Sequence, residues 1–355
     1  MRVLPALLLT LAALALSGAR GGPEPVRLDV ILAEAPAQKL SDYGLFQDPG
    51  ARTPSPGVTP YDLTTPLFSD YAAKHRFVFT PAGKSATYRS EGVLEFPVGS
   101  VLVKTFAYAP DMRRPAVDER YVETRLLIRK AEGWVALAYV WNADQTEAVL
   151  KRTGARLDVA FIDPSGAARA INYLVPNQNQ CKTCHSAQGA LVPIGPRARN
   201  LNRDLDYGDR TQNQLEAWRR LGHLSGGPAP ADAPRTPAWD SQTEPLEARA
   251  RAYLDVNCGH CHSPAGMAST SGLFLTLEED RPVHLGINKA PVAAGRGSGG
   301  HKVSIDPGRP DTSILVHRMA SDDPGVMMPE LGRSLVHAEG LALVAAYVES
   351  LTPAP

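Results

Sequence analysis

The spacing of hydrophobic positions predicts an extended backbone over the first half of the chain. Residues 26–175 contain short alternating or continuous apolar runs, rich in β-branched and aromatic side chains and bounded by Pro, Gly, Asp or Asn. Such runs predict β-strands, and Glu132-Gly133 predicts the turn of a hairpin between the last two. The clearest runs are Phe77–Phe79, Ser100–Phe106, Thr124–Arg129 and Trp134–Trp141. Their regular spacing predicts a β-rich domain that is either a sandwich or barrel-like.

The apolar period changes to a helical one in the next part of the chain, residues 176–225. Within it, Thr211–Leu224 predicts a short amphipathic helix with Trp218 on its apolar stripe. Residues 226–240 are rich in Gly, Pro and Ala, which is typical of a linker. This part therefore separates the β-rich domain from the end of the chain.

The last region, residues 241–355, is predicted to be mainly α-helical. Thr243 is the expected N-cap of a helix that leads into Cys258, and Val344 and Val348 belong to the apolar stripe of a closing helix. Together with the strands before it, this region makes the expected fold class a multidomain α+β protein.

The N-terminus and the charge balance restrict the compartment and the partners. Residues 1–19 predict a signal peptide: Met1-Arg2, then an apolar run, then small residues up to Ala19. The run is too short to cross a membrane comfortably, and no later hydrophobic span follows, so we expect a soluble periplasmic protein; a retained N-terminal anchor is the alternative. With 37 basic and 37 acidic residues, the net charge favours neither nucleic acid nor an anionic membrane.

All four cysteines lie in two strings of the form C-x-x-C-H. The strings are Cys181–His185 and Cys258–His262. This spacing is typical of covalent attachment of a c-type haem, in which two thiols bind the vinyl groups and the histidine binds the iron. We therefore expect two covalently bound haem c groups; a structural zinc site and disulfides within each pair are the alternatives. The expected binding residues are Cys181, Cys184, Cys258 and Cys261 for the porphyrins, and His185 and His262 for the irons.

The second string has a predictable sixth iron ligand. Met328 precedes Pro329, whose ring disfavours helical backbone at the preceding residue, so the methionine is expected on an extended segment. Thioether sulfur is a soft iron ligand. Coordination by one His and one Met gives the haem a higher reduction potential than coordination by two His. Met327 is the next choice, and Met319 and Met267 are weaker ones.

The first string has no such ligand. No methionine lies between Cys184 and Cys258, and Pro176 leaves no room for a leading helix. Its haem is closed by another residue, of which His223 is one choice, or its iron is left open to a small molecule. Ligands from other regions are equally admissible: His75, Met112, His284, His301 and His317.

Several segments together resemble a family of secreted di-haem c-type cytochromes. In chain order they are Tyr61–Asp70, Phe96–Gly99, Val103–Phe106, Glu123–Leu127, Trp141-Asn142, Gln145-Thr146, Asn179–His185, Leu201–Arg203, Asn213–Leu215, Trp218 and Tyr253–Cys258. The resemblance implies a β-rich N-terminal domain fused to haem-binding segments. The end of the chain is separately similar to a class I cytochrome c domain, which implies a mainly α-helical, cytochrome c-like haem-binding region in which His262 and Met328 are the axial pair.

Three functions are consistent with these features. The leading one is a periplasmic di-haem cytochrome that transfers electrons between redox partners such as a dehydrogenase and a terminal oxidase or reductase. The second is a haem enzyme in which an open first haem reduces peroxide or a similar small oxidant. An enzyme needs a distal acid/base group that the sequence does not reveal, so no catalytic residue is assigned. The third is a ligand-binding β module with ancillary haems.

Overall fold

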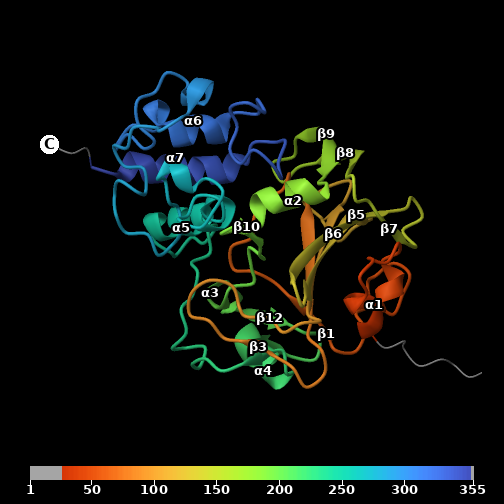
Figure 1. Cartoon of the computed structure of the whole chain (residues 1–355). Helices are drawn as coiled ribbons and strands as arrows, with labels where there is room; N and C mark the ends of the chain where they lie inside the picture. The colour runs from red at the N-terminus through yellow and green to blue at the C-terminus, as the bar shows by residue number, and fades with distance from the viewer. Residues whose placement is uncertain (1–25, 353–355) are drawn as a thin grey trace, which may run out of the picture.

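A computed structural model describes residues 26–352 of the chain (Figure 1). The predicted signal peptide, residues 1–19, lies outside the described residues. Among the residues that are described, no helix combines the length and apolar character needed to cross a membrane. The structure is mainly β-sheet with a few helices, as expected for a β-rich chain.

The centre of the molecule is a six-stranded antiparallel sheet. Its strand order is β1-β2-β4-β5-β6-β7, with bounds Val58–Tyr61, Ala73–Phe79, Val101–Tyr108, Arg120–Lys130, Gly133–Trp141 and Ala148–Leu150. All four strand-forming runs of the sequence lie in it. The β5–β6 hairpin turns at Ala131 and Glu132, where Lys130 pairs with Gly133. The predicted turn is therefore confirmed to within one residue.

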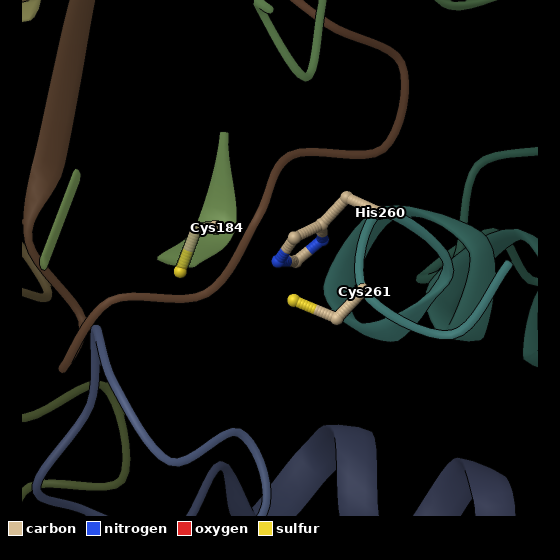
Figure 2. A group of neighbouring side chains, drawn as sticks. All are labelled: Cys184, His260 and Cys261. Carbon is tan, nitrogen blue, oxygen red and sulfur yellow. The ribbon is translucent and has the colours of Figure 1, made fainter. Parts of the chain in front are cut away.

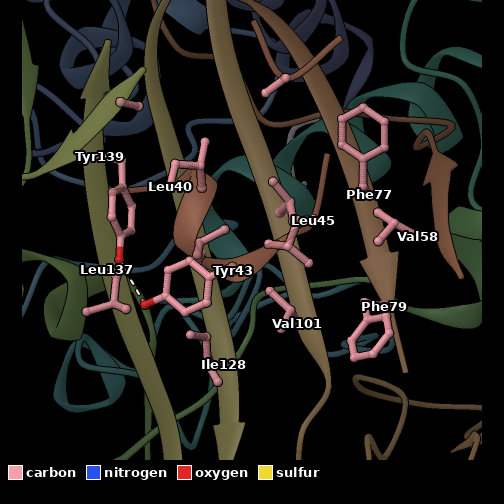
Figure 3. Close-up of a cluster of buried hydrophobic side chains, with 14 of the residues drawn as sticks. Leu40, Tyr43, Leu45, Val58, Phe77, Phe79, Val101, Ile128, Leu137 and Tyr139 are labelled. Carbon is pink, nitrogen blue, oxygen red and sulfur yellow. Dashed lines mark hydrogen bonds between the residues drawn. The ribbon is translucent and has the colours of Figure 1, made fainter. Parts of the chain in front are cut away.

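One face of the sheet is largely apolar, apart from a row across the strands that contains His75, Thr105 and Thr124. Alternate residues of each strand, such as Val101 and Val103 of β4, pack beneath helix α1 (Leu28–Leu32) and the turn η1 (Ser41–Tyr43) (Figure 3). Side chains of a strand alternate between the two faces, so one set of positions can be buried here throughout. Tyr43 and Tyr139 share a buried hydrogen bond of 2.9 Å at the centre of this layer.

The opposite face is divided into three parts. One end packs on a cluster that contains Leu102 and Trp218, and the other end packs on a cluster that contains Phe106 and Tyr173. Between these two clusters, the middle of the face carries charged side chains, among them Lys104 and Arg125. This interruption of the apolar face positions the candidate site described below.

The remaining strands form short two-stranded ladders. The longest is the hairpin β8–β9. The ladders are β8 (Ala155–Ile162) with β9 (Ala168–Val175), β3 (Ala86–Thr87) with β14 (Leu224–Ser225), β10 (Ser186–Ala187) with β11 (Ala190–Leu191), and β12 (Asp204–Asp206) with β13 (Thr211–Asn213). The β-rich domain therefore contains one open sheet and short ladders rather than the predicted sandwich or barrel, because helices and irregular segments, not a second large sheet, cover its faces.

Three short helices follow the β8–β9 hairpin, namely α2 (Gln178–Cys184), α3 (Ala198–Leu201) and α4 (Gln214–Arg220). Helix α4 is shorter than the predicted helix over residues 211–224. The Asn213 side chain accepts a hydrogen bond of 2.9 Å from the Leu215 amide, which begins the helix there, and Thr211–Asn213 pairs as a strand instead.

The end of the chain contains α5 (Leu246–Leu254), a π-helical turn η2 (Asp255–Gly259), α6 (Ile314–Ala320) and α7 (Ala338–Ser350), with short 3-10 turns η3 (Ser269–Ser271), η4 (Gly295–Ser298) and η5 (Pro310–Thr312). Long irregular segments separate α5 from α6 and α6 from α7, so the region is less helical than predicted. Pro264, Pro282 and Pro291 interrupt the longest of these segments. The expected N-cap at Thr243 is wrong, because α5 begins after Pro245.

Polar contacts join the sheet to this last region. The Asp70 carboxylate accepts hydrogen bonds of 2.7–2.9 Å from the amides of Ser334 and Leu335 and from the Ser334 hydroxyl. The Phe68 amide donates to the Asn257 side chain at 2.8 Å. The loop between β1 and β2 thus holds the segment that follows Met328 against the sheet.

Candidate functional site

The first C-x-x-C-H string lies on helix α2. The helix begins directly after Pro176, where the Asn177 side chain accepts from the Gln180 amide and the Gln180 side chain accepts from the Asn177 amide. This capping box satisfies two amides of the first turn and starts the helix three residues before Cys181. The sequence predicted that Pro176 leaves no room for a leading helix, but a short helix begins at Gln178 and carries the string itself.

The second string begins in the π-helical turn η2 that extends α5. The His262 amide donates to the Cys258 carbonyl at 2.9 Å, so the helical path continues through the string. A Cβ on Gly259 would lie 3.2 Å from the Leu275 carbonyl oxygen, which favours glycine at this position. Widened helical turns of this kind often mark functional sites.

The inner ends of the two strings meet. Ligand atoms of Cys184, His260 and Cys261 all lie within 4.8 Å of one another (Figure 2). Cys184 comes from the first string, and the other two come from the second. This group offers three metal donors, whereas structural zinc sites almost always have four. The juxtaposition brings together two strings that the sequence separates widely.

A cavity of about 190 Å³ lies beside the first string. Cys181, Cys184 and His185 all line it, and so do strands β2, β4, β5 and β6 of the main sheet. The sheet is therefore a wall of the first cavity. Its charged lining residues are mostly cationic: Lys74, Arg76, Lys104, Arg125, Arg197, Asp255 and Arg333.

A second cavity, of about 370 Å³, lies beside the second string. Cys258, Cys261 and His262 all line it, together with side chains from α6 and the irregular segments of the last region. The two cavities share part of their walls: Cys184, Asn257, Cys258, His260, Met319, Met328, Pro329 and Leu331 line both. Each string thus contributes its full set of cysteines and histidine to one cavity, and the cavities adjoin.

The histidines that end the two strings, His185 and His262, are held in the neutral form. The ring Nδ1 of His185 lies 3.0 Å from the Val192 carbonyl oxygen, which assigns the proton to Nδ1 and leaves Nε2 unprotonated. Burial, reinforced by the nearby Lys104, lowers the pKa of His185 to about 3. Burial lowers the pKa of His262 to about 4. A neutral imidazole is the form that binds iron.

The thiols differ in environment. Burial raises the pKa of Cys258 to about 12 and also raises the pKa of Cys181. A hydrogen bond with Cys261 holds the pKa of Cys184 below its usual range, and the same contact raises that of Cys261. Cys261 Sγ also lies 3.8 Å from the Thr183 carbonyl oxygen. All four thiols are free of disulfides.

The predicted methionines separate into two groups. Met328, the first choice as a ligand from the sequence, lines both cavities. Met319 also lines both, and the largely exposed Met267 lines only the second. Met327 is buried but lines neither cavity. The structure thus brings Met328, and not Met327, to the strings.

His223 is not brought to the first string. It lies in the core beneath the sheet, where its ring nitrogens lie 2.7 Å from the Thr59 hydroxyl and 2.8 Å from the Thr80 hydroxyl. Both nitrogens are therefore engaged by core residues, and His223 lines neither cavity. The other possible ligands named from the sequence also line neither cavity. They are His75, Met112, His284, His301 and His317.

Two histidines that line the first cavity were missed by the sequence. His260 lies inside the second string, where it read as a spacer, and His337 precedes α7. The His337 ring stacks on Phe68 at a centroid distance of 4.1 Å, and its Nδ1 lies 2.9 Å from the Tyr253 hydroxyl. Burial lowers the pKa of His337 to about 4. No local signal marks His337, since its place in the site depends on how the last region folds against the sheet.

The site combines two strings of haem-binding type, two adjoining and largely apolar cavities, and a cationic sheet wall on one of them. Neutral histidines lie at the end of each string, and a methionine lines both cavities. This arrangement suits a large, mostly apolar, metal-containing group better than a small polar substrate. Comparisons with known proteins add no relative: no family model, no curated protein and no solved structure matches this chain.

Proposed function

We propose that this chain is an exported di-haem c-type cytochrome that transfers electrons between redox partners. The observation that supports it best is the pairing of each C-x-x-C-H string with its own cavity, with the two cavities sharing a wall. Electron transfer through two cofactors needs them close together, and the contact between Cys184 and Cys261 supplies that proximity. Partners such as a dehydrogenase and a terminal oxidase or reductase belong to the proposal.

The residues present fit haem c. Cys181 and Cys184 would bind one porphyrin with His185 on its iron, and Cys258 and Cys261 would bind the other with His262. Met328 would complete the second iron. The His185 Nδ1 lies 3.0 Å from the Val192 carbonyl oxygen, and such a hydrogen bond of one ring nitrogen is typical of a histidine that binds a metal through the other. When bound, haem c supplies a one-electron couple whose potential depends on the axial ligands and the surrounding polarity.

The resemblance of the last region to a class I cytochrome c domain belongs to the same proposal. The string at the end of α5, the late methionine and the closing helix α7 occur in the expected order. Helix α7 packs on α5 through Val344 and Val348. The β-rich domain would then not be a separate ligand-binding module, since its sheet forms a wall of the first cavity.

A second function, reduction of a small oxidant at the first haem, is favoured by one observation. His337 and Lys104 line the first cavity, and each can exchange a proton. An enzyme of this kind needs an iron that accepts an external ligand. The electron-transfer proposal requires no external ligand at either iron.

Pyridine haemochrome on the purified full-length protein, with metal analysis on the same sample, tests the proposal. We expect two haems per chain and no stoichiometric zinc. Carbon monoxide added to the ferrous protein then separates the two functions: an unchanged spectrum supports electron transfer, and rapid binding at one haem supports the enzyme. Zinc without haem would overturn both.

A further inference from the structure

The sheet wall of the first cavity carries an unusual row of cations. Arg76, Lys104 and Arg125 lie directly opposite one another on neighbouring strands β2, β4 and β5. Lys74 precedes Arg76 by two residues on β2, so it is on the same face of the sheet. Like charges directly opposite each other destabilise a sheet, so a row of this kind needs compensation.

Two of the four cations are compensated by protein carboxylates. Arg76 forms an ion pair of 2.8 Å with Asp62. Arg125 binds both oxygens of Glu123, at 2.7 and 2.8 Å. These two arginines therefore belong to the structure of the wall.

The two lysines are not compensated. Within residues 26–352 neither forms an ion pair, and Lys74 donates only to the Ala72 carbonyl, at 3.0 Å. Both ammonium groups lie over the same aromatic ring: the Lys74 Nζ is 6.0 Å and the Lys104 Nζ is 5.1 Å from the centre of the Phe106 ring. Both line the first cavity. Two unpaired cations therefore converge on one end of a cavity that is otherwise mostly apolar.

The electrostatics agree with this geometry. Burial, followed by the neighbouring cations, holds the pKa of Lys74 well below its usual range and lowers that of Lys104 to about 7. An anion placed between the ammonium groups would restore their charge and remove the mutual repulsion. Charge-assisted hydrogen bonds to a carboxylate are among the stronger polar contacts in proteins.

We propose that Lys74 and Lys104 form a carboxylate-binding site at the sheet end of the first cavity. The carboxylate has two possible sources, a propionate of the haem attached to the first string or a free organic acid. The haem source rests on the proposed function, and the free-acid source does not. In both cases the pair positions the ligand in the cavity and sets the charge beside it.

The test uses the purified holoprotein and the variants Lys104→Met, Lys74→Met and Lys104→Arg. The matched control is Lys84→Met, a change at an exposed lysine outside both cavities. Haem content is measured first for each protein. Acetate is then titrated by calorimetry, and the two reduction potentials and the infrared carboxylate bands are recorded.

Saturable acetate binding that weakens about tenfold in Lys104→Met, returns in Lys104→Arg and is unchanged in Lys84→Met supports the free-acid source. Absence of acetate binding, with a lower potential at one haem and shifted carboxylate bands in Lys104→Met and Lys74→Met but not in Lys104→Arg or Lys84→Met, supports the haem propionate. Neither binding nor a shift in either lysine variant overturns the proposal. A protein without haem that still binds acetate through these lysines would overturn the proposed function and leave this site standing.

Discussion

The two cavities present the same C-x-x-C-H string with very different walls. The first cavity has a β-sheet wall. Of the Lys, Arg, Asp and Glu side chains that line it, six are cationic and one is a carboxylate. The second is enclosed by helices and irregular segments and has only Lys289, Arg318 and Glu330 as charged lining residues. The same C-x-x-C-H string therefore lies in two different electrostatic surroundings.

This difference indicates what the β-rich domain contributes. Positive charge near a redox centre favours its reduced form, and a low-dielectric wall strengthens the effect. The sheet thus acts on the first cavity, whereas the proposed tuning of the second rests on Met328 as an axial ligand. Two haems bound here would be tuned by two separate means.

The largest expected effect comes from removing one string at a time. Cys181→Ala with Cys184→Ala should reduce the haem content from two per chain to one, and Cys258→Ala with Cys261→Ala should do the same, since each cavity has its own pair. Pyridine haemochrome measures the content. Loss of both haems from either variant would contradict two independent sites, and a Ser41→Ala variant, far from both cavities, serves as the control.

A smaller effect separates the axial ligands. Met328→Ala should abolish the weak red charge-transfer band of methionine-ligated ferric haem and lower one reduction potential, leaving the other unchanged. Met327→Ala, one residue away and outside both cavities, is the matched control and should retain the band. Persistence of the band in Met328→Ala would point to Met319, which lines the same cavities.

The sequence predicts the features that depend on neighbouring residues along the chain. Alternation located the strands of the main sheet, and the strings and Met328 follow from short motifs. Register between strands is not local: nothing in the sequence shows that Lys104 faces Arg76 and Arg125. A single sequence therefore predicted the two C-x-x-C-H strings and Met328 but not the charged wall.

His223 illustrates the opposite error. At the end of a predicted amphipathic helix, it was one of several possible ligands of the first iron. In the fold, the segment after α4 packs against the sheet. Thr59 of β1 and Thr80, which directly follows β2, lie within hydrogen-bond distance of the two ring nitrogens of His223. Tertiary packing decided its role, as it also decided the role of His337.

The contact at Asp70 supplies a prediction about how firmly the sheet holds the last region. The backbone of Asp70 has a positive φ of +48°, which Asn also tolerates, so Asp70→Asn retains the side-chain shape and the backbone conformation. The substitution replaces the carboxylate that accepts hydrogen bonds from the Ser334 and Leu335 amides. We expect the free energy of unfolding to fall by about 3 kcal/mol, because charged hydrogen bonds are lost at a buried site. Denaturant unfolding measures it. The exposed variant Asp240→Asn should be neutral, and an equal loss there would contradict the assignment.

The smallest expected effect separates acid sensitivity of the fold from events in either cavity. Burial lowers the pKa of His223 to about 4, so between that value and about 6.5 the unfolded chain binds the proton that the folded chain does not. The contribution of neutral His223 to the free energy of unfolding is complete above this pH range and is lost as the pH falls. The loss is about 2 kcal/mol between pH 7 and pH 5. His223→Gln should remove that part of the slope in denaturant unfolding, whereas His301→Gln, outside both cavities, should retain it. An unchanged slope in His223→Gln would assign the acid sensitivity to the cavity histidines instead.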